Sequence, residues 1–401
     1  MTRARPHDTA REWLWIPAVI LALGAVFALL QPPVKPDLAH DGSYYLLMAE
    51  QMQEGRAPET ISPFVLRVGT PWLAGVVARA AGASISNGFF AVNVLAGALT
   101  AWLFSVWLRP HIPDFITRVT LVVLFVVLPY SPFRFTFYYP TLTDSVAMLF
   151  LLMGLILLDR MSARLDAARA ILMALIVAVG CVFRELVLAV AIAAVFVRPW
   201  PATAAAWLVR AVPLLGITTI AVVRSWVVIT PSRYEPAEEV WRWLEWKTLS
   251  MMVLAVLFVF GPLIVVLGQR WRSTWTAAIA RPDLTVFVAI FAAAGWLGAS
   301  DTERIFVFAT PVVLMQIGKT LADIRVARGY QEFGMLVALQ LVACRALWPI
   351  GGPLLPLFSE HFSYFSVWLD QWWRMFFLVI YAVAAALIIA IVRSAPRSQA
   401  I

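Results

Sequence analysis

Charged side chains stand at isolated points of a chain that is otherwise strongly apolar. Asp41 falls in the segment HDGSYY (residues 40–45), just after the first long apolar stretch. A carboxylate held where lipid headgroups meet water suits a general base that takes a proton from a polar acceptor. His40 is a second candidate for substrate contact. The alternative is structural, because Asp41 or Ser43 could cap a helix that begins here.

A single arginine lies in an apolar segment bounded by proline, PFVLRVGTPWL (residues 63–73). The guanidinium of Arg67 could grip a phosphate or a carboxylate with two N–H groups in a setting of reduced dielectric. It could equally extend toward the membrane surface while its stem stays among apolar groups. Both interpretations remain open from the sequence.

A third polar segment, YYPTLTDS (residues 138–145), precedes another apolar stretch. Asp144 is expected near the positive end of the helix that follows, so a role in the first turn explains it as well as substrate contact does. Tyr139 is a further candidate for contact with substrate.

Two more arginines interrupt apolar stretches. Residues 170–197 would form a helix about 42 Å long, too long for a bilayer core of roughly 30 Å, so we expect the chain to reverse at Arg184-Glu185. Neighbouring residues do not face each other on a helix, and each therefore needs its own partner, a ligand or another side chain. Arg304 ends the segment SDTER (residues 300–304) and could reach the same place, although a solvated turn is the alternative.

The elements that position these residues are membrane helices. The chain has 401 residues, of which 62% are apolar and 13% charged, a balance that indicates lipid as the solvent. We therefore expect an all-α, polytopic membrane protein with one transmembrane domain over residues 1–401. About twelve helices are predicted, at 12–31, 87–108, 118–133, 143–159, 169–183, 186–198, 204–227, 248–268, 284–299, 305–318, 331–349 and 372–393.

The distribution of arginine and lysine predicts the orientation. With both termini cytoplasmic in an inner (plasma) membrane, most of the 31 basic residues lie on the cytoplasmic side. The large extracytoplasmic loops are then 32–86, 228–247 and 350–371. Interfacial helices are expected in the first and fourth outer loops, where residues 64–83 could alternatively cross the membrane.

Several function classes are disfavoured. Cys181 and Cys344 each lie in apolar sequence, without the spacing of a zinc or redox site, and four scattered histidines make a zinc site improbable. The net charge of +8 is explained by membrane orientation, so no nucleic-acid partner is implied.

In their order along the chain, these features resemble the GT-C class of integral-membrane glycosyltransferases. The resemblance rests on an acidic residue after the first helix (Asp41), the segment PFVLRVGTPWLAG, the helix start YYPTLTD, then FRE and DTERIFVFATP. It implies transfer of a sugar from a polyprenyl-phosphate donor to a lipid or small glycan acceptor at the extracytoplasmic face of the bilayer. Asp41 would be the base, and Arg67, Arg184 and Arg304 would hold the phosphate.

This chain departs from the class in one respect that bears on cofactors. Many members carry paired acids in the first loop, whereas the neighbour of Asp41 is His40, so metal dependence is doubtful and no cofactor is assigned. The main alternative function is a transporter or flippase for a lipid-linked or anionic substrate, for which buried charges would also be expected. The absence of an obvious internal repeat argues against it, and no motif supports an acyl- or phospho-group transferase.

Overall fold

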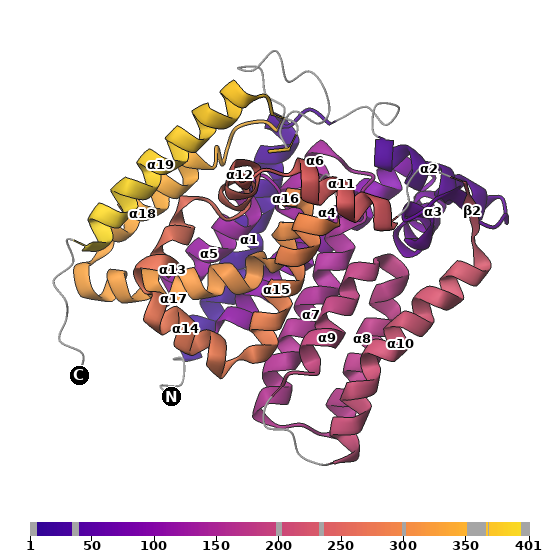
Figure 1. Cartoon of the computed structure of the whole chain (residues 1–401), viewed down its shortest axis with the longest axis horizontal. Coiled ribbons are helices and arrows are strands. Elements are labelled where there is room, and N and C mark those ends of the chain that lie inside the picture. Colours follow the sequence, from indigo (N-terminus) through magenta and orange to yellow (C-terminus); the bar gives the residue numbers. More distant parts are fainter. Residues whose placement is uncertain are drawn as a thin grey trace.

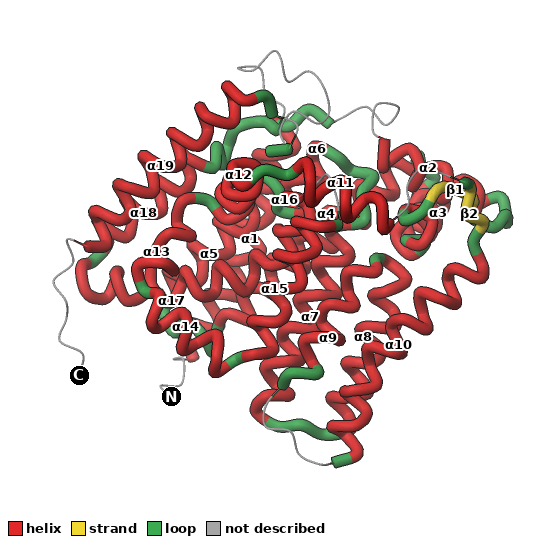
Figure 2. The backbone as a smooth tube through the Cα atoms, viewed as in Figure 1, coloured by secondary structure: helices red, strands yellow, loops and turns green. Residues whose placement is uncertain are grey.

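The protein is almost entirely helical. The computed structural model describes residues 6–33, 40–197, 203–231, 236–298, 302–350, 366–367 and 369–393, and it is 81% helical. Figure 1 shows the helices in chain order, and Figure 2 shows that the only strands of the described residues form one short pair beside α2 and α3. The prediction of an all-α protein is confirmed.

The elements have the following bounds. The helices are α1 (Pro6–Leu30), α2 (His40–Gln53), α3 (Gly69–Ala81), α4 (Ile85–Leu108), α5 (Phe115–Val127), α6 (Pro132–Tyr138), α7 (Asp144–Ala163), α8 (Ala167–Phe183), α9 (Leu188–Ala194), α10 (Ala204–Trp226), α11 (Pro236–Trp246), α12 (Leu249–Phe260), α13 (Val265–Gln269), α14 (Trp271–Ala280), α15 (Pro282–Leu297), α16 (Thr302–Phe306), α17 (Thr310–Arg328), α18 (Tyr330–Ala343) and α19 (Gln371–Arg393). Strand β1 (Glu59–Ile61) pairs in parallel with β2 (Val228–Thr230), and short 3₁₀ segments include η2 (Phe64–Leu66) and η3 (Glu185–Val187).

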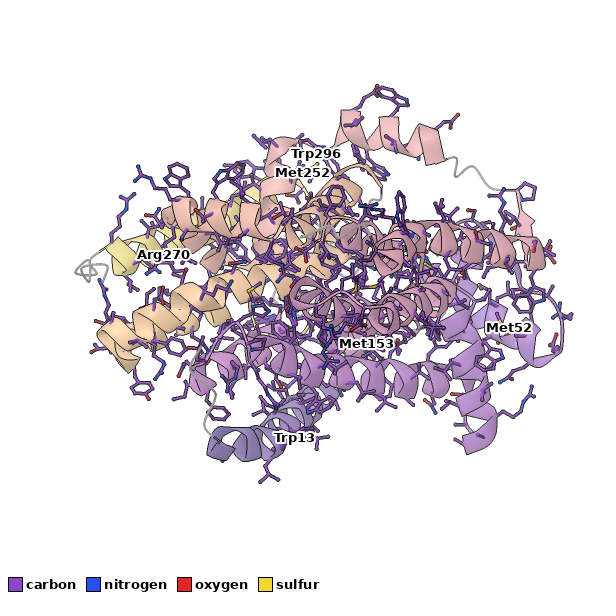
Figure 3. All side chains as sticks on the ribbon, turned by 90° about the horizontal axis from the view of Figure 1, so that it is seen from below. Trp13, Met52, Met153, Met252, Arg270 and Trp296 are labelled. Atoms are coloured by element: carbon purple, nitrogen blue, oxygen red, sulfur yellow. The ribbon has the colours of Figure 1, made fainter. Side chains whose placement is uncertain are left out.

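The bundle has two ends that are chemically distinct. We call the upper end in Figure 1 the site end, since α1 and α8 end there and α2, α7 and α16 begin there. At the far end, Asp159 near the end of α7 accepts a hydrogen bond from Trp107 Nε1 and contacts His111 Nε2 and Arg281 Nη1, both at 2.6 Å. This cluster ties α4, α7 and the turn before α15 together. Figure 3 shows the bundle from below, with Met52 of α2 and Arg270 on opposite lateral sides of the molecule.

Length and composition identify the chain as a membrane protein. Among the described residues, seven helices are long and apolar enough to cross a bilayer, or nine if two sharply bent helix pairs each count as one span. The prediction of a polytopic membrane protein is confirmed at this level. The predicted number of about twelve crossings is not confirmed.

The discrepancy comes from helices that are shorter than expected. The described part of the predicted crossing at 186–198 contains the end of η3 and the seven-residue helix α9, which is about 10 Å long, and the predicted crossing at 331–349 contains the 14-residue α18. The expected outer loop after residue 133 is instead partly helical, because α6 continues to Tyr138. Residues 64–83 contain the 13-residue α3, which is too short to cross a bilayer core.

Glycines allow the close helix packing around the short segments. A Cβ added to Gly88 of α4 would lie 2.2 Å from the carbonyl oxygen of Ala74 in α3, and one added to Gly154 of α7 would lie 2.4 Å from Val190 in α9. Close backbone approach through small residues is typical of helix association in membranes. It also fixes α9 against α7, which places the reversal at Arg184 level with the start of α7.

Candidate active site at one end of the helix bundle

Helix ends bring the predicted residues together. Asp41 is the second residue of α2, Asp144 is the first residue of α7, and Arg184 follows the last residue of α8. Arg304 lies in the short helix α16, and Arg67 follows η2. Each stands where an apolar helix stops or starts, because a charged side chain is least costly there. The five segments are far apart in the sequence but meet at the site end.

Arg304 joins two carboxylates. Its Nη1 donates to Asp41 Oδ2 at 2.7 Å, and its Nε donates to Asp144 Oδ2 at 3.2 Å. The other oxygen of Asp144 pairs with Nη1 of Arg184, whose guanidinium also lies 5.2 Å from the centre of the Phe308 ring. Arg184, Asp144 and Arg304 are buried, at 2%, 6% and 6% exposure. Asp144 is therefore held between two guanidiniums.

Asp41 is the accessible member of this network. Its side chain is 22% exposed, against 8% for Asp144. Only its Oδ2 bonds to Arg304, and Oδ1 has no hydrogen-bond donor among the described residues. The carboxylate is thus fixed in orientation while one oxygen remains able to accept a proton.

Arg67 forms a second, bidentate ion pair beside the first network. Its Nε donates to Glu185 Oε2 at 3.0 Å and its Nη2 to Oε1 at 2.5 Å, while Nη1 donates to the hydroxyl of Tyr45 at 2.8 Å. Burial alone would lower the pKa of Arg67, but the Glu185 carboxylate more than offsets this and raises the pKa above its usual value. Arg67 is therefore a permanent cation. Arg184 and Glu185, adjacent in sequence, have separate partners as expected.

Tyr139 ties the start of α2 to the start of α7. Its hydroxyl accepts a hydrogen bond from the backbone N–H of Gly42 at 2.9 Å, which satisfies one of the amides left open at a helix N-terminus. Burial, and after it the negative charge of Asp41, raises the pKa of Tyr139 well above its usual value. The hydroxyl therefore stays protonated and holds Gly42, next to Asp41, in place.

Three contributors were missed from the sequence. Tyr45, fully buried, gives Arg67 its third contact. Asn93 of α4 donates to the carbonyls of Pro140 and Leu142 at 2.8 and 2.7 Å and so shapes the turn before α7. Glu303, fully buried, accepts from the backbone N–H of Ser366 at 2.7 Å. Of these three, only Asn93 could have been found from the sequence, because an asparagine inside an apolar helix needs hydrogen-bond partners. The side chain of His40, also predicted, lies outside the described part of the structure.

An apolar groove adjoins the charged residues. It measures about 530 Å³, lies between α3, α8 and α10, and begins at Val68 and Gly69, directly after Arg67. Its wall continues along Val179 and Val182 of α8 to Trp226 at the end of α10. A hydrocarbon chain in this groove would have its polar end near Arg67.

The described residues contain no group of three His, Cys, Asp or Glu side chains arranged to hold a metal ion. No known protein family, curated protein sequence or solved structure matches this chain.

Proposed function

We propose that this protein is a glycosyltransferase of the GT-C type, which transfers a sugar from a polyprenyl-phosphate donor to a lipid or small glycan acceptor. One observation carries the proposal. Three carboxylates and three guanidiniums from distant segments gather at one end of an apolar bundle, and Asp41 is the accessible carboxylate of the network that Arg304 joins. Such a site combines a base with fixed positive charge, as transfer from a phosphate leaving group requires.

Asp41 is the proposed base. Its Oδ1 takes the proton of the acceptor hydroxyl, whose oxygen attacks the anomeric carbon of the sugar. The bond between that carbon and the phosphate oxygen breaks, and its electron pair leaves on the polyprenyl phosphate. The geometry supports this role because the ion pair with Arg304 orients the carboxylate through Oδ2 alone.

Arg304 is the proposed first contact of the donor phosphate. It lies next to Asp41 and is shared between two carboxylates, so a phosphate can replace one of these bonds without leaving the guanidinium unpaired. Arg184 and Arg67 stand behind it, each with its own carboxylate. Their charge stabilises the negative charge that develops on the leaving phosphate. The groove that begins at Val68 would hold the donor's prenyl chain.

The place of the site within the bundle favours an enzyme over a transporter or flippase. Transporters bind substrate near the middle of the membrane, at the interface of related repeats. Here the charged residues lie at helix termini on one end. Under this proposal, the site end faces the extracytoplasmic side of the inner (plasma) membrane and both termini are cytoplasmic. Reaction partners are then the lipid-linked sugar and a lipid or glycan acceptor.

Transfer by the reconstituted protein tests the function. Vesicles containing the protein and membrane lipid acceptors are given polyprenyl phosphates that carry a radiolabelled hexose or pentose. We expect label in the acceptor fraction, and Asp41→Asn should lower the rate by about 100-fold or more because the base is lost. The variant should fold, since Arg304 retains Asp144.

Glu54→Gln is the matched control, because Glu54 lies just after α2 and pairs only with Arg56 at the surface. It should transfer sugar at the wild-type rate. Full transfer by Asp41→Asn would remove Asp41 as the base. Label that moves between leaflets without reaching an acceptor would identify a flippase instead.

A further inference from the structure

Three arginines at the site end have no acidic partner among the described residues, and we propose that Arg345 and Arg374, with Arg134 behind them, bind the phosphate of an anionic phospholipid between α18 and α19. This site is separate from the Asp41 network and does not depend on the proposed transfer reaction. In the described part of the chain, none of these three arginines forms an ion pair. Arg67, Arg184 and Arg304, by contrast, are each paired with a carboxylate.

Arg345 is held between aromatic rings, and no carboxylate of the described residues pairs with it. It follows α18 with a backbone φ of 50°, and its guanidinium lies 4.6 Å from the centre of the Phe377 ring and 5.6 Å from that of Phe258. Its Nε is buried without a hydrogen-bond partner. Aromatic faces stabilise a guanidinium from its flat sides but leave its N–H edge available. An oxyanion is the group that such an edge recognises.

Arg134 adds a second positive charge close by. It is 2% exposed, and its guanidinium donates to the backbone carbonyls of Val127, Arg345 and Trp348. Carbonyl oxygens satisfy its hydrogen bonds but contribute no negative charge. Since Arg134 contacts the backbone of Arg345 itself, the positive charge of both residues accumulates in one place. A charge buried in this way is costly unless a counter-ion offsets it.

Arg374 completes the arrangement from α19. It stands three residues before Phe377, so both side chains lie on one face of that helix, the face that meets Arg345. It is half-buried, and its Nη1 is buried without a hydrogen-bond partner. Arg374 therefore lies about one helical turn from Phe377, the residue that Arg345 contacts, and both arginines have a buried guanidinium nitrogen without a hydrogen-bond partner.

The surroundings identify the occupant as a lipid. The outward surface of α19 is apolar and open, with Trp372 at 86% exposure and Met375, Phe376 and Val379 above 50%. In a membrane this surface is covered by acyl chains. A phospholipid lying along it carries its phosphate at the helix end, where the arginines are. An anionic headgroup supplies the missing negative charge, whereas a zwitterionic one does not.

Lipid retention measured by native mass spectrometry tests the site. The purified protein is exchanged into detergent micelles that contain equal amounts of phosphatidylglycerol and phosphatidylcholine. We expect one phosphatidylglycerol to be retained preferentially, and added inorganic phosphate to leave it in place. Arg345→Gln and Arg374→Gln should each lower this retention by about tenfold, as the loss of one charge-assisted hydrogen bond implies.

Arg79→Gln is the control, because Arg79 is an exposed arginine of α3 whose Nη2 donates to the Gln53 carbonyl. It should retain the lipid as the wild type does. Equal retention of both lipids by the wild type, or unchanged retention in both test variants, would overturn the proposal. Displacement by inorganic phosphate would show a site for free anions instead. Should Arg345→Gln not fold, Arg374→Gln decides, since that side chain lies at the edge of the bundle.

Discussion

Asp144 lies between two guanidiniums, those of Arg184 and Arg304. This arrangement predicts that substitution of Asp144 lowers the free energy of unfolding more than substitution of Arg184 does. Asp144→Asn leaves Arg184, 2% exposed, with only the Thr143 hydroxyl at 3.5 Å and the Phe308 ring. Breaking a buried pair in this way costs about 3–5 kcal/mol in the free energy of unfolding. We expect about 3 kcal/mol, because asparagine keeps an acceptor oxygen.

Arg184→Met should cost less. Asp144 then keeps Arg304, whose Nε remains at 3.2 Å, so no buried carboxylate is left alone. The loss is that of hydrogen bonding to a charged group, about 1.5–3 kcal/mol, and we expect a value near the lower end. In the double variant Arg304 still pairs with Asp41, and the orphaned Arg184 charge is gone. The double variant should therefore be more stable than the sum of the single effects predicts, by about 1–2 kcal/mol.

Unfolding in mixed micelles, followed by circular dichroism as dodecyl sulfate is added, measures all three variants. Arg169→Met is the control on the same helix, because Arg169 forms a partly exposed pair with Asp166. It should change the free energy of unfolding by less than about 1 kcal/mol. Additive effects of Asp144→Asn and Arg184→Met, within about 0.5 kcal/mol, would refute the shared-carboxylate reasoning. So would a larger cost for Arg184→Met than for Asp144→Asn.

Two further stability predictions follow from the packing and the hydrogen bonds. Gly88→Ala should destabilise the protein by about 1–3 kcal/mol, since its Cβ would lie 2.2 Å from the Ala74 carbonyl oxygen. Gly334→Ala is the control and should not destabilise the protein, because no atom from another part of the chain lies within 4 Å of the added Cβ. The same unfolding titration compares the two variants, and equal stability would contradict the close approach of α3 and α4. Tyr139→Phe should cost about 1–2 kcal/mol by leaving the Gly42 N–H unsatisfied. Burial, and after it Asp41, raises the pKa of Tyr139 above its usual 10.0. The greater stability of the wild type over Tyr139→Phe should therefore decrease as the pH rises above about 10, where the tyrosine ionises in the unfolded chain but not in the folded protein. A stability difference between the wild type and Tyr139→Phe that is unchanged at about pH 11 would contradict the raised pKa of Tyr139.

The meeting of Asp41, Arg184 and Arg304 follows from reasoning that the sequence permits. Each residue interrupts or borders an apolar stretch, and alternating helix directions place the three interruptions at one end. The reversal at Arg184 is predicted from length, since residues 170–197 are too many for one crossing, and from the distribution of basic residues, which a single crossing would invert in every later loop. The ends of membrane helices can thus be predicted from the sequence, because a charged residue within the apolar part of a helix is costly.

The pairing within the site could not be predicted in the same way. Arg67 and Glu185 are 118 residues apart, and nothing local to either indicates the other. Tyr45 belongs to a helix of low amphipathicity, so its complete burial against Arg67 depends on tertiary packing. The predicted helix lengths were wrong for a related reason. The seven-residue α9 packs against Gly154 of α7, a contact between distant segments that apolar composition does not specify.

The short pairing of β1 with β2 also determines which changes near Arg67 the fold can accommodate. Main-chain hydrogen bonds hold residues 59–61 against 228–230, and Val228 N–H donates to the Pro58 carbonyl at 2.9 Å. Since nearly every residue carries these main-chain groups, the identities of the six strand residues can drift without shifting the arginine relative to α10. The number of residues between Ile61 and Arg67, in contrast, cannot change without shifting the arginine. One insertion there would rotate the guanidinium away from Glu185, so chain length in this connection is under tighter constraint than its composition.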